Sequence, residues 1–501
     1  MKKIVLFTGI VLVLITLMLT SFARPVQAAG SISYQEIDAY IERQLGRLNI
    51  PGASWVIVEN DQIVHAKGFG VTGPSGEVPS SQTPYFIGSL TKSVTALAVM
   101  QLVENGAVEL DAPIQQYLPW FTLADPQAAS QISVRHLLNQ ASGLPQIPGM
   151  IGLSNFDNTT GAAEQQARAL ATLEPARPVG SAWEYSNLNF NLLGLVIEAV
   201  SGETYADYVQ NHIFGPLDMR YSFTSKTLAQ QNNLAVGHEM WFGLPIAVPH
   251  LAVPVGSLAS GQLISSSEDM GRYLIAQLNQ GEYNGTHLLS AEGVEQMHHP
   301  ASAINLGGRE IGSYGMGWFV NEINGEKFIF HTGEVPDYFS YMALLPEHDR
   351  ALLLLVNANE QLYNYALWTM AEDATLMLAG VSPQPNAWPI LPWALRAALL
   401  LPILFISSIL TTFKRIERWQ MHPASRPNPT RIWLWHILLP AICNLVIITS
   451  AVAILASGML KFIMLFMGDI ASVILLCGGI ALVWVFVRTP LVLRVLRTPL
   501  D

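Results

Sequence analysis

Three apolar stretches near the end of this 501-residue chain constrain its fold more than any other feature. They cover residues 394–413, 432–456 and 462–487, and each is long enough to cross the hydrocarbon core of a bilayer as a helix. A lipid environment offers no water to bond the backbone, so an apolar stretch of this kind spans it in helical form. The sequence therefore predicts three transmembrane helices, with the lipid bilayer as their partner.

Basic residues around these stretches predict their orientation. The loop between the first two contains Lys414, Arg415, Arg418, Arg426 and Arg431, and Arg488, Arg494 and Arg497 follow the third. Lysine and arginine collect on the cytoplasmic side of membrane proteins. We therefore expect the C-terminus in the cytoplasm and the residues before 394 outside the cell, in a multi-pass protein of the cell membrane.

The N-terminus has the pattern of a secretory signal. Two lysines precede an uncharged run over residues 4–22, and Val26 and Ala28 are small enough for the cleavage positions. We expect residues 1–28 to be a signal peptide, with an uncleaved anchor as the alternative because the run is long. At the other end of the outer domain, four prolines in residues 381–392 predict a stiff tether to the membrane.

Charge and cysteine content exclude several functions. Residues 31–390 hold 34 acidic and 13 basic side chains, a net charge of −21, whereas residues 391–501 hold 3 acidic and 10 basic ones. A domain this acidic repels nucleic acid. The only cysteines, Cys443 and Cys477, lie in the apolar stretches. The outer domain thus has no disulfide and no thiol nucleophile.

Periodicity within residues 31–380 predicts an α+β domain. Helical patterns cover residues 33–48 and 362–378, and helices and irregular loops dominate residues 89–269. Strand patterns occupy residues 53–59, 62–69, 316–321, 327–331, 338–345 and 351–357. The economical arrangement is one antiparallel sheet made from the early hairpin and the late strands, flanked by the terminal helices, with a helical lobe inserted between them.

Ser89 and Lys92 form the first candidate catalytic pair. They lie three residues apart where a helix is expected to begin, so their side chains share one face. A serine hydroxyl needs a neighbouring base to become a nucleophile, and a buried lysine with a lowered pKa can serve. The structural alternative is a helix cap followed by a solvated lysine.

Two further clusters add polar groups. Tyr185 and Asn187 stand two residues apart on an expected loop, where a phenol can shuttle a proton and an amide can bond lysine and substrate. His331, Thr332 and Gly333 end a strand pattern, and the backbone N–H of Glu334 could pair with that of Ser89 around an oxyanion. For these clusters, packing and helix capping are the structural alternatives.

Two histidine-containing dipeptides, His238-Glu239 and His298-His299, lack the spacing of metal ligands. We expect both on the surface.

Together these motifs resemble those of the serine penicillin-binding proteins and class C beta-lactamases. The sequence has Ser89-Leu90-Thr91-Lys92, then Tyr185-Ser186-Asn187, then His331-Thr332-Gly333, in the order S-x-x-K, Y-x-N and K/H-T-G. Other stretches resembling the family include 136–144, 256–270, 314–318 and 339–346. The resemblance implies a beta-lactamase/transpeptidase-like fold and a serine hydrolase in which Ser89 forms an acyl-enzyme, Lys92 and Tyr185 act as bases and Asn187 positions the substrate. It implies no metal and no organic cofactor.

One departure from the family bears on the substrate. Relatives that bind the carboxylate of penicillins or D-Ala-D-Ala peptides usually have lysine where this chain has His331. Esterase-like and peptidase-like relatives carry histidine there. The expected substrate is therefore a small molecule or peptide with an amide or ester, such as a peptidoglycan-derived peptide or a beta-lactam-like compound. The negative charge of Glu334 beside the oxyanion site has no explanation at this level.

Two other classes of protein are alternatives to this interpretation, an α/β-hydrolase and a receptor. An α/β-hydrolase requires Gly-x-Ser-x-Gly, which the chain lacks. A receptor whose outer domain is acylated and barely turns over is the serious alternative. The short cytoplasmic loop and tail leave no room for a signalling domain, so we expect a tethered hydrolase.

Overall fold

The structure is a computed structural model that describes residues 33–497 except 160, 307–308, 324 and 384–389. The expected signal peptide and half of the expected tether lie outside the described residues. Two units are present, and each is described by itself. The larger contains residues 33–240 and 245–383, and the smaller contains residues 390–497 together with Trp241–Leu244.

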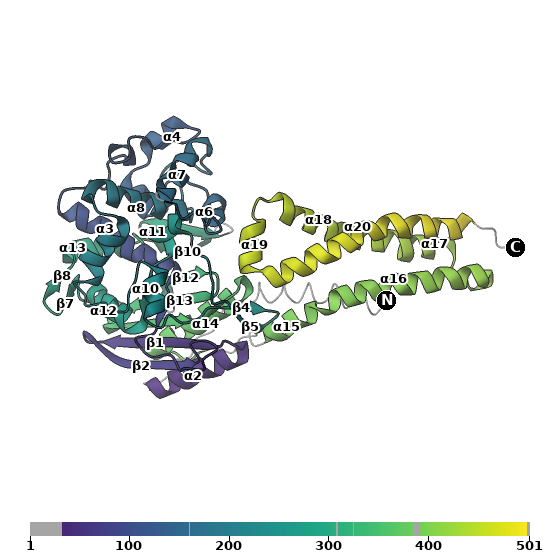
Figure 1. Cartoon of the computed structure of the whole chain (residues 1–501), viewed down its shortest axis with the longest axis horizontal. Helices are drawn as coiled ribbons and strands as arrows, with labels where there is room; N and C mark the ends of the chain where they lie inside the picture. The colour runs from purple at the N-terminus through teal and green to yellow at the C-terminus, as the bar shows by residue number, and fades with distance from the viewer. Residues whose placement is uncertain (1–32, 160, 307–308, 324, 384–389, 498–501) are drawn as a thin grey trace. The chain divides into compact units, whose positions relative to one another are not determined.

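An eight-stranded antiparallel sheet forms the centre of the larger unit (Figure 1). Its order is β2-β1-β14-β13-β12-β11-β10-β9. The strands are β1 (Gly52–Glu59), β2 (Gln62–Gly70), β9 (Ser302–Leu306), β10 (Arg309–Tyr314), β11 (Phe319–Ile323), β12 (Glu326–Val335), β13 (Tyr338–Leu345) and β14 (Arg350–Val356). The predicted union of the early hairpin with the late strands is confirmed, since β1 pairs with β14.

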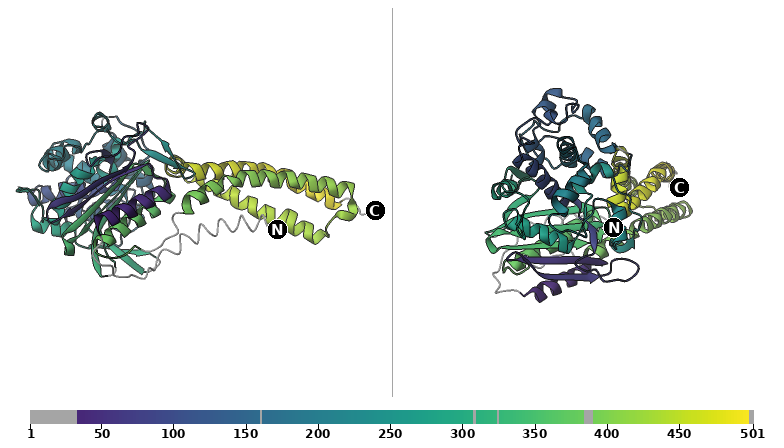
Figure 2. Two further views of the ribbon diagram at one scale, coloured as in Figure 1. Left: turned by 90° about the horizontal axis from the view of Figure 1, so that it is seen from below. Right: turned by 60° about the vertical axis from the view of Figure 1, so that its left-hand side comes forward.

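Side chains of the strands alternate between the two faces of the sheet, and different helices cover each face. In register across β1, β14 and β13, Trp55, Leu354 and Tyr341 share one face, and Val56, Leu353 and Met342 share the other. On the first face lie α2 (Tyr34–Leu48) and α14 (Gln361–Leu378) (Figure 2). The Trp55 indole donates to Asp38 of α2. On the second lies α12 (Ser267–Leu278). Both faces are therefore buried, as the apolar runs of β1 and β14 require.

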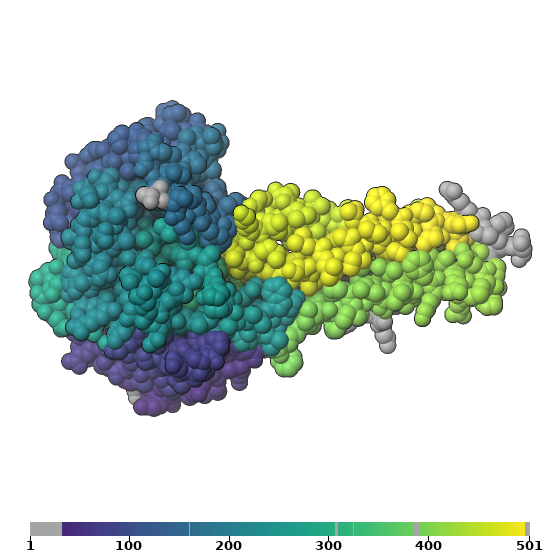
Figure 3. Space-filling model, in the orientation of Figure 1, coloured from purple at the N-terminus to yellow at the C-terminus, as the bar shows by residue number. Residues whose placement is uncertain are grey.

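The helical lobe is inserted between the early hairpin and the late strands, as predicted. Its helices are α3 (Thr91–Glu104), α4 (Pro126–Gln131), α5 (Val134–Leu138), α6 (Gln146–Gly152), α7 (Ala162–Arg168), α8 (Asn187–Ser201), α9 (Tyr205–Val209), α10 (Lys226–Gln231), α11 (Leu258–Gly261) and α13 (Ala291–Met297). In the space-filling view, the blue lobe and the purple hairpin occupy opposite ends of this unit, with later teal segments between them (Figure 3).

Several short strands were not predicted. They are β3 (Pro84–Phe86) paired with β6 (Ile264–Ser266), β7 (Glu282–Tyr283) paired with β8 (Thr286–His287), and β4 (His238–Trp241) joined with β5 (Leu244–Ala247) and β15 (Ala358–Asn359). Three of them, β4, β5 and β6, lie within residues 89–269, which were expected to be helical or irregular. β9 and β10 were also not predicted. The strand expected over residues 316–321 begins only at Phe319, because Gly317 has a φ of 79°. His238 is buried, which corrects its expected place on the surface.

Three long apolar helices make up most of the smaller unit. The helical segments of this unit are α15 (Leu391–Ala398), α16 (Leu400–Met421), α17 (Pro429–Ile432), α18 (Leu439–Ala456), the short α19 (Leu460–Phe466) and α20 (Gly468–Arg497). The stretches Leu391–Met421, Pro429–Ala456 and Gly468–Val495 are long and apolar enough to cross a membrane. The third begins at Gly468 and not at residue 462, because α19 is a separate short helix. The described residues thus contain the expected number of candidate membrane helices.

Candidate active site

Ser89 lies at the point where β3 turns into α3. Residues Gly88–Leu90 form a single 3₁₀ turn, and α3 starts at Thr91. Lys92 is in the first turn of α3 and is completely buried, whereas Ser89 is half-buried and open to a substrate. The local geometry expected from the S-x-x-K spacing is therefore present.

Residues 87–89, which include the nucleophile Ser89, pack directly against the end of β12. The Ser340 hydroxyl donates to the carbonyl of Ile87 at 2.7 Å. A Cβ on Gly333 would lie 2.1 Å from that same carbonyl oxygen, so only glycine fits. Gly88 has a φ of 51°, and a Cβ there would lie 2.4 Å from the backbone nitrogen of Glu334. These two glycines bring the peptide before Ser89 into contact with the strand end that carries Glu334.

Lys92 makes three polar contacts. Its Nζ lies 2.9 Å from Ser89 Oγ, 2.8 Å from Asn187 Oδ1 and 2.6 Å from the carbonyl oxygen of Ser260. Burial lowers the pKa of Lys92 well below its ordinary value. A neutral amine has two N–H donors and one lone pair, and the amide and carbonyl oxygens can only accept. When Lys92 is neutral and donates to these two oxygens, its lone pair therefore faces the Ser89 hydroxyl.

Tyr185 approaches the same serine oxygen from the loop before α8. Its hydroxyl donates to Ser89 Oγ at 2.9 Å, and its ring centroid lies 5.0 Å from Lys92 Nζ. Burial raises the pKa of Tyr185, so the phenol holds its proton. The Ser89 oxygen can accept from Tyr185 while its own hydrogen points to Lys92. This is the arrangement in which a proton can leave the serine toward the amine.

Gln140 holds the loop that carries Tyr185 and Asn187. Its Oε1 accepts from the backbone N–H of Ser186 at 2.9 Å and also contacts the side-chain amide of Asn189. Asn187 itself begins α8, and its Nδ2 lies 3.4 Å from the carbonyl of Gly149 in α6, which leaves Oδ1 for Lys92. The amide is thus oriented by both of its ends.

The ring of His331 lies near both Tyr185 and Tyr314, but its hydrogen bond is to Tyr314. Its Nδ1 lies 2.6 Å from the carbonyl oxygen of Thr332, which can only accept, so Nδ1 carries the hydrogen. Its Nε2 lies 3.1 Å from the hydroxyl of Tyr314, which donates to it. Burial, and then the charge of Lys92, lower the pKa of His331 to about 3. The imidazole is therefore neutral, and its two ring nitrogens form hydrogen bonds with Thr332 and Tyr314 and not with Tyr185.

Glu334 directs its carboxyl group away from Ser89. Along β12, Phe330, Thr332 and Glu334 alternate with His331 and Gly333, and the Glu334 Oε2 accepts from the amide of Asn364 in α14 at 2.6 Å. Burial raises the pKa of Glu334 to about 7. The negative charge that had no explanation from the sequence is thus bonded behind the sheet and partly neutralised near pH 7. Thr332 contributes its carbonyl to His331, and its side chain is half-buried.

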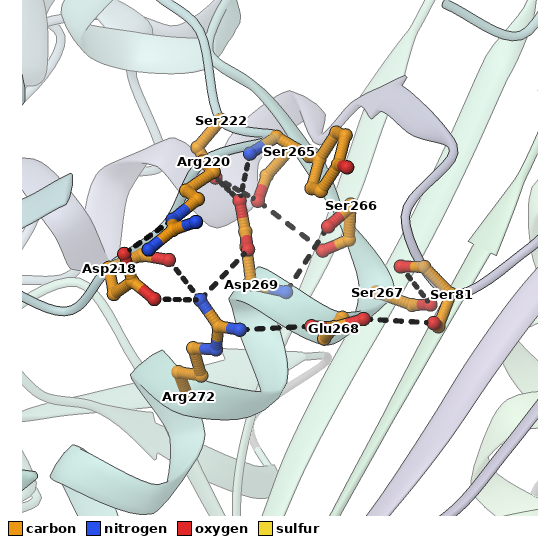
Figure 4. A network of polar contacts seen from close by, with 11 residues as sticks. Ser81, Asp218, Arg220, Ser222, Ser265, Ser266, Ser267, Glu268, Asp269 and Arg272 are labelled. Atoms are coloured by element: carbon orange, nitrogen blue, oxygen red, sulfur yellow. Dashed lines mark hydrogen bonds and ion pairs between the residues drawn. The ribbon is translucent and has the colours of Figure 1, made fainter. Parts of the chain in front are cut away.

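A polar network next to the site holds the strand that pairs with β3 (Figure 4). Asp269, which is completely buried, accepts from the backbone N–H of Tyr221 at 2.6 Å and from the Ser222 hydroxyl at 2.8 Å. The Ser222 and Ser265 hydroxyls are 2.7 Å apart, and Ser265 belongs to β6. Because β6 pairs with β3 directly before the nucleophile turn, this network supports the position of Ser89.

The structure joins Lys92 and Tyr185 to Ser89 by hydrogen bonds, and Asn187 to Lys92. It places the backbone of the end of β12 beside the nucleophile turn, whereas the side chain of Glu334 points away from Ser89. It also adds partners that were not predicted. Ser260 and Tyr314 lie in stretches noted only for their family resemblance, and Gln140 lies in another. Their motifs were the available signal, but their contacts depend on the tertiary fold. Among the described residues, no group of three or more histidine, cysteine or acidic side chains is arranged to hold a metal ion.

Comparisons with known proteins agree with this arrangement. The profile of the family described as Beta-lactamase matches residues 37–375. Protein flp of Staphylococcus aureus is 29% identical over 331 residues, which cover 66% of this chain and 64% of that protein. The putative penicillin-binding protein PbpX of Bacillus subtilis is 28% identical over 281 residues, 56% of this chain and 64% of that protein. The chain thus spans less than two thirds of the length of these relatives.

Solved structures show the same fold. The octameric penicillin-binding protein homologue from Pyrococcus abyssi superposes with a TM-score of 0.61 at 28% identity, covering 71% of this chain and 80% of that one. A D-stereospecific amidohydrolase from Streptomyces sp. superposes with a TM-score of 0.55 at 23% identity, covering 65% of this chain and 95% of that one, and shares the fold.

Proposed function

This chain belongs to the Beta-lactamase family, and from that premise we propose that it is a membrane-tethered serine hydrolase that cleaves an amide or ester through an acyl-enzyme on Ser89. The observation that carries the proposal is the convergence of two groups on one oxygen. Lys92 Nζ and the Tyr185 hydroxyl each lie 2.9 Å from Ser89 Oγ. Those are the contacts that nucleophilic catalysis requires.

Acylation begins with proton transfer. Neutral Lys92 takes the hydrogen of Ser89 as Oγ attacks the carbonyl carbon, and the resulting ammonium keeps its contacts with Asn187 and Ser260. Negative charge develops on the carbonyl oxygen, where the backbone N–H groups of Ser89 and Glu334 would receive it. The Tyr185 hydroxyl, beside the serine oxygen, gives its proton to the departing amine or alcohol. Water then attacks the acyl-enzyme, with the same groups acting in reverse.

The apolar C-terminal helices support attachment to a membrane. The basic residues that flank them favour a cytoplasmic C-terminus and an active site outside the cell. A cysteine-accessibility assay on intact cells, with single cysteines at exposed Gln82 and at Arg418 in a background lacking Cys443 and Cys477, tests this orientation. Labelling of position 82 alone by an impermeant maleimide is expected, and labelling of position 418 alone would reverse the assignment.

Covalent labelling tests the chemistry. A fluorophosphonate is expected to modify the detergent-solubilised chain at Ser89, located by peptide mass spectrometry. Ser89→Ala should abolish both labelling and hydrolysis of p-nitrophenyl acetate, whereas Ser93→Ala, which changes a buried serine one helical turn away, should retain both. Persistence of hydrolysis in Ser89→Ala would refute the assignment. Labelling without turnover would favour an acylated receptor over a hydrolase.

A further inference from the structure

His331 has no hydrogen left for a substrate. Its Nδ1–H points to the carbonyl of Thr332 at 2.6 Å, and its Nε2 accepts from the Tyr314 hydroxyl at 3.1 Å. The ring is 1% exposed, and Tyr314 is completely buried. A carboxylate placed beside this part of β12 would therefore find neither a positive charge nor a free donor on His331. An anion taken from water without such a partner is strongly disfavoured.

The charges around the site add to this disadvantage. Lys92 is buried and bonded to three oxygens. When the amine is neutral its lone pair faces Ser89, so it gives a substrate carboxylate no positive charge. The outer domain carries a net charge of −21 over residues 31–390. The net charge of the domain therefore opposes an anionic group next to Ser89.

Aromatic rings occupy the space beside these groups. Phe319 of β11 lies 5.0 Å from the His331 ring and 4.8 Å from the Tyr314 ring, measured between centroids. It is also parallel to Tyr185 within 9° at 6.4 Å. Trp183 lies 6.3 Å from Tyr185 and 6.4 Å from Phe319. We call Trp183, Tyr185, Tyr314 and Phe319 the aromatic wall.

The outer members of the aromatic wall are accessible. Trp183 and Phe319 are half-buried, in contrast to Tyr314 and His331 behind them. Because the Tyr185 hydroxyl touches Ser89 Oγ, these two rings flank the place where bond cleavage is proposed. Exposed faces of tryptophan and phenylalanine favour planar, apolar groups.

We propose that the site selects esters and amides whose group beside β12 is uncharged and aromatic, with Phe319 and Trp183 as the specificity residues and Tyr314 fixing His331 as a neutral acceptor. This inference rests on the proposed acyl-transfer function and names its substrate class. It separates this chain from relatives that hold a substrate carboxylate with lysine at the position of His331.

A matched substrate pair tests the preference for an uncharged group. Hippuryl-D-phenyllactate and hippuryl-D-phenyllactamide contain the same scissile ester and differ only in a terminal carboxylate or amide. With the detergent-solubilised full chain, kcat/KM for the amide should exceed that for the carboxylate about tenfold or more, as expected for an unpaired anion. Equal values, or a preference for the carboxylate, would overturn the inference. If the proposed function itself fails, neither substrate will show release that depends on Ser89.

A second comparison tests the aromatic wall. Hippuryl-D-phenyllactamide should be preferred to hippuryl-D-lactamide by about tenfold or more, since the phenyl group contacts Trp183 and Phe319. Phe319→Leu, which keeps an apolar side chain, should reduce this ratio toward 1 while the fluorophosphonate still labels Ser89. Tyr365→Ala, on an exposed ring of α14, is the matched control and should leave the ratio unchanged. An undiminished ratio in both Phe319→Leu and Trp183→Leu would remove these residues from substrate recognition.

Discussion

Lys92 Nζ and the carbonyl oxygen of Ser260 lie 2.6 Å apart, although 168 residues separate them in the sequence. This contact joins the first turn of α3 to α11. It occupies one of the N–H groups of the amine, and Asn187 occupies another. The base is therefore oriented by groups that cannot themselves donate a proton to it, and its remaining position is directed at Ser89.

Replacement of Lys92 should separate chemistry from folding. Lys92→Met keeps a similar volume but removes the base, so fluorophosphonate labelling of Ser89 should slow about 100- to 10,000-fold, the usual loss with a general base. The measurement is the pseudo-first-order labelling rate, with thermal unfolding as the check on folding. Lys226→Met is the matched control, because Lys226 is a partly buried lysine whose amine contacts the Leu251 carbonyl. A labelling rate in Lys92→Met close to wild type would exclude Lys92 as the base.

Tyr314→Phe should remove the hydrogen bond to His331 Nε2. Loss of the hydroxyl leaves the buried Nε2 without a donor, which we expect to destabilise the chain by about 1–3 kcal/mol. The discrimination against the carboxylate substrate should also weaken, but only as the pH approaches 3, because burial and then the charge of Lys92 lower the pKa of His331 to about 3 and Nε2 takes up a proton only there. The ratio of kcat/KM values for the two phenyllactate substrates between pH 3 and pH 8 measures this.

Tyr85→Phe is the control for that variant. Tyr85 is also completely buried, but its hydroxyl has no hydrogen-bond partner among the described residues. Its removal should change neither stability nor the substrate ratio. If Tyr314→Phe behaved like Tyr85→Phe, the hydroxyl of Tyr314 would have no role in fixing His331.

Glu334→Gln should change how stability depends on pH. Burial raises the pKa of Glu334 from 4.5 to about 7 in the folded chain. Between these values the folded state holds a proton that the unfolded state has released, so the contribution is present at low pH and is lost as the pH rises through 7. The unfolding temperature of wild type relative to Glu334→Gln should therefore fall between pH 4.5 and pH 8.

This difference isolates one carboxyl group. Burial also raises the pKa of Asp269 to about 6 and of Asp337 to about 7, but both groups are present in the two proteins compared. Glu347→Gln, which changes an exposed acid after β13, should show no such trend. A difference that was constant with pH would mean that Glu334 is ionised throughout the range.

Asp269→Ala should weaken both the fold and the site. It leaves the backbone N–H of Tyr221 and the hydroxyl of Ser222 without their buried acceptor and removes, 3.7 Å away, one of the three acidic partners that Arg272 has among the described residues. A loss of about 3–5 kcal/mol is expected for breaking such a buried network. Asp111→Ala breaks an exposed ion pair with Arg135 and should be close to wild type. Similar unfolding temperatures for the two variants would contradict the role of the network shown in Figure 4.

Much of the fold could be predicted from local sequence patterns. The spacing of Ser89 and Lys92 was sufficient to place both at a helix start, and the turn at Asn60 and Asp61 was visible because both residues suit positive φ angles, here 47° and 61°. β9 and β10 could not be foreseen, because they are the last two strands at one end of the sheet, where burial does not impose alternation, and their register shifts between Glu310 and Gly312.

In the candidate site, too, some residues could be predicted from the sequence and some contacts could not. The motifs supplied Tyr185, Asn187 and His331, since a motif can be recognised without coordinates. The identity of the hydrogen-bond partner of His331 could not be read from the chain, because Tyr185 and Tyr314 both offer a hydroxyl and only tertiary packing chooses between them. The same holds for Ser260, which contributes a backbone carbonyl and therefore has no side-chain signature.

The pairing of β1 with β14 has a consequence for biogenesis. Ala53 is matched with Val356, so the middle of the sheet joins segments separated by about 300 residues. During synthesis, the early hairpin emerges long before its neighbour and must wait with one edge unpaired. The sheet therefore cannot be completed until nearly all of residues 52–356 have been synthesised, so the unfinished edge of the hairpin is exposed to unwanted pairing for most of that time.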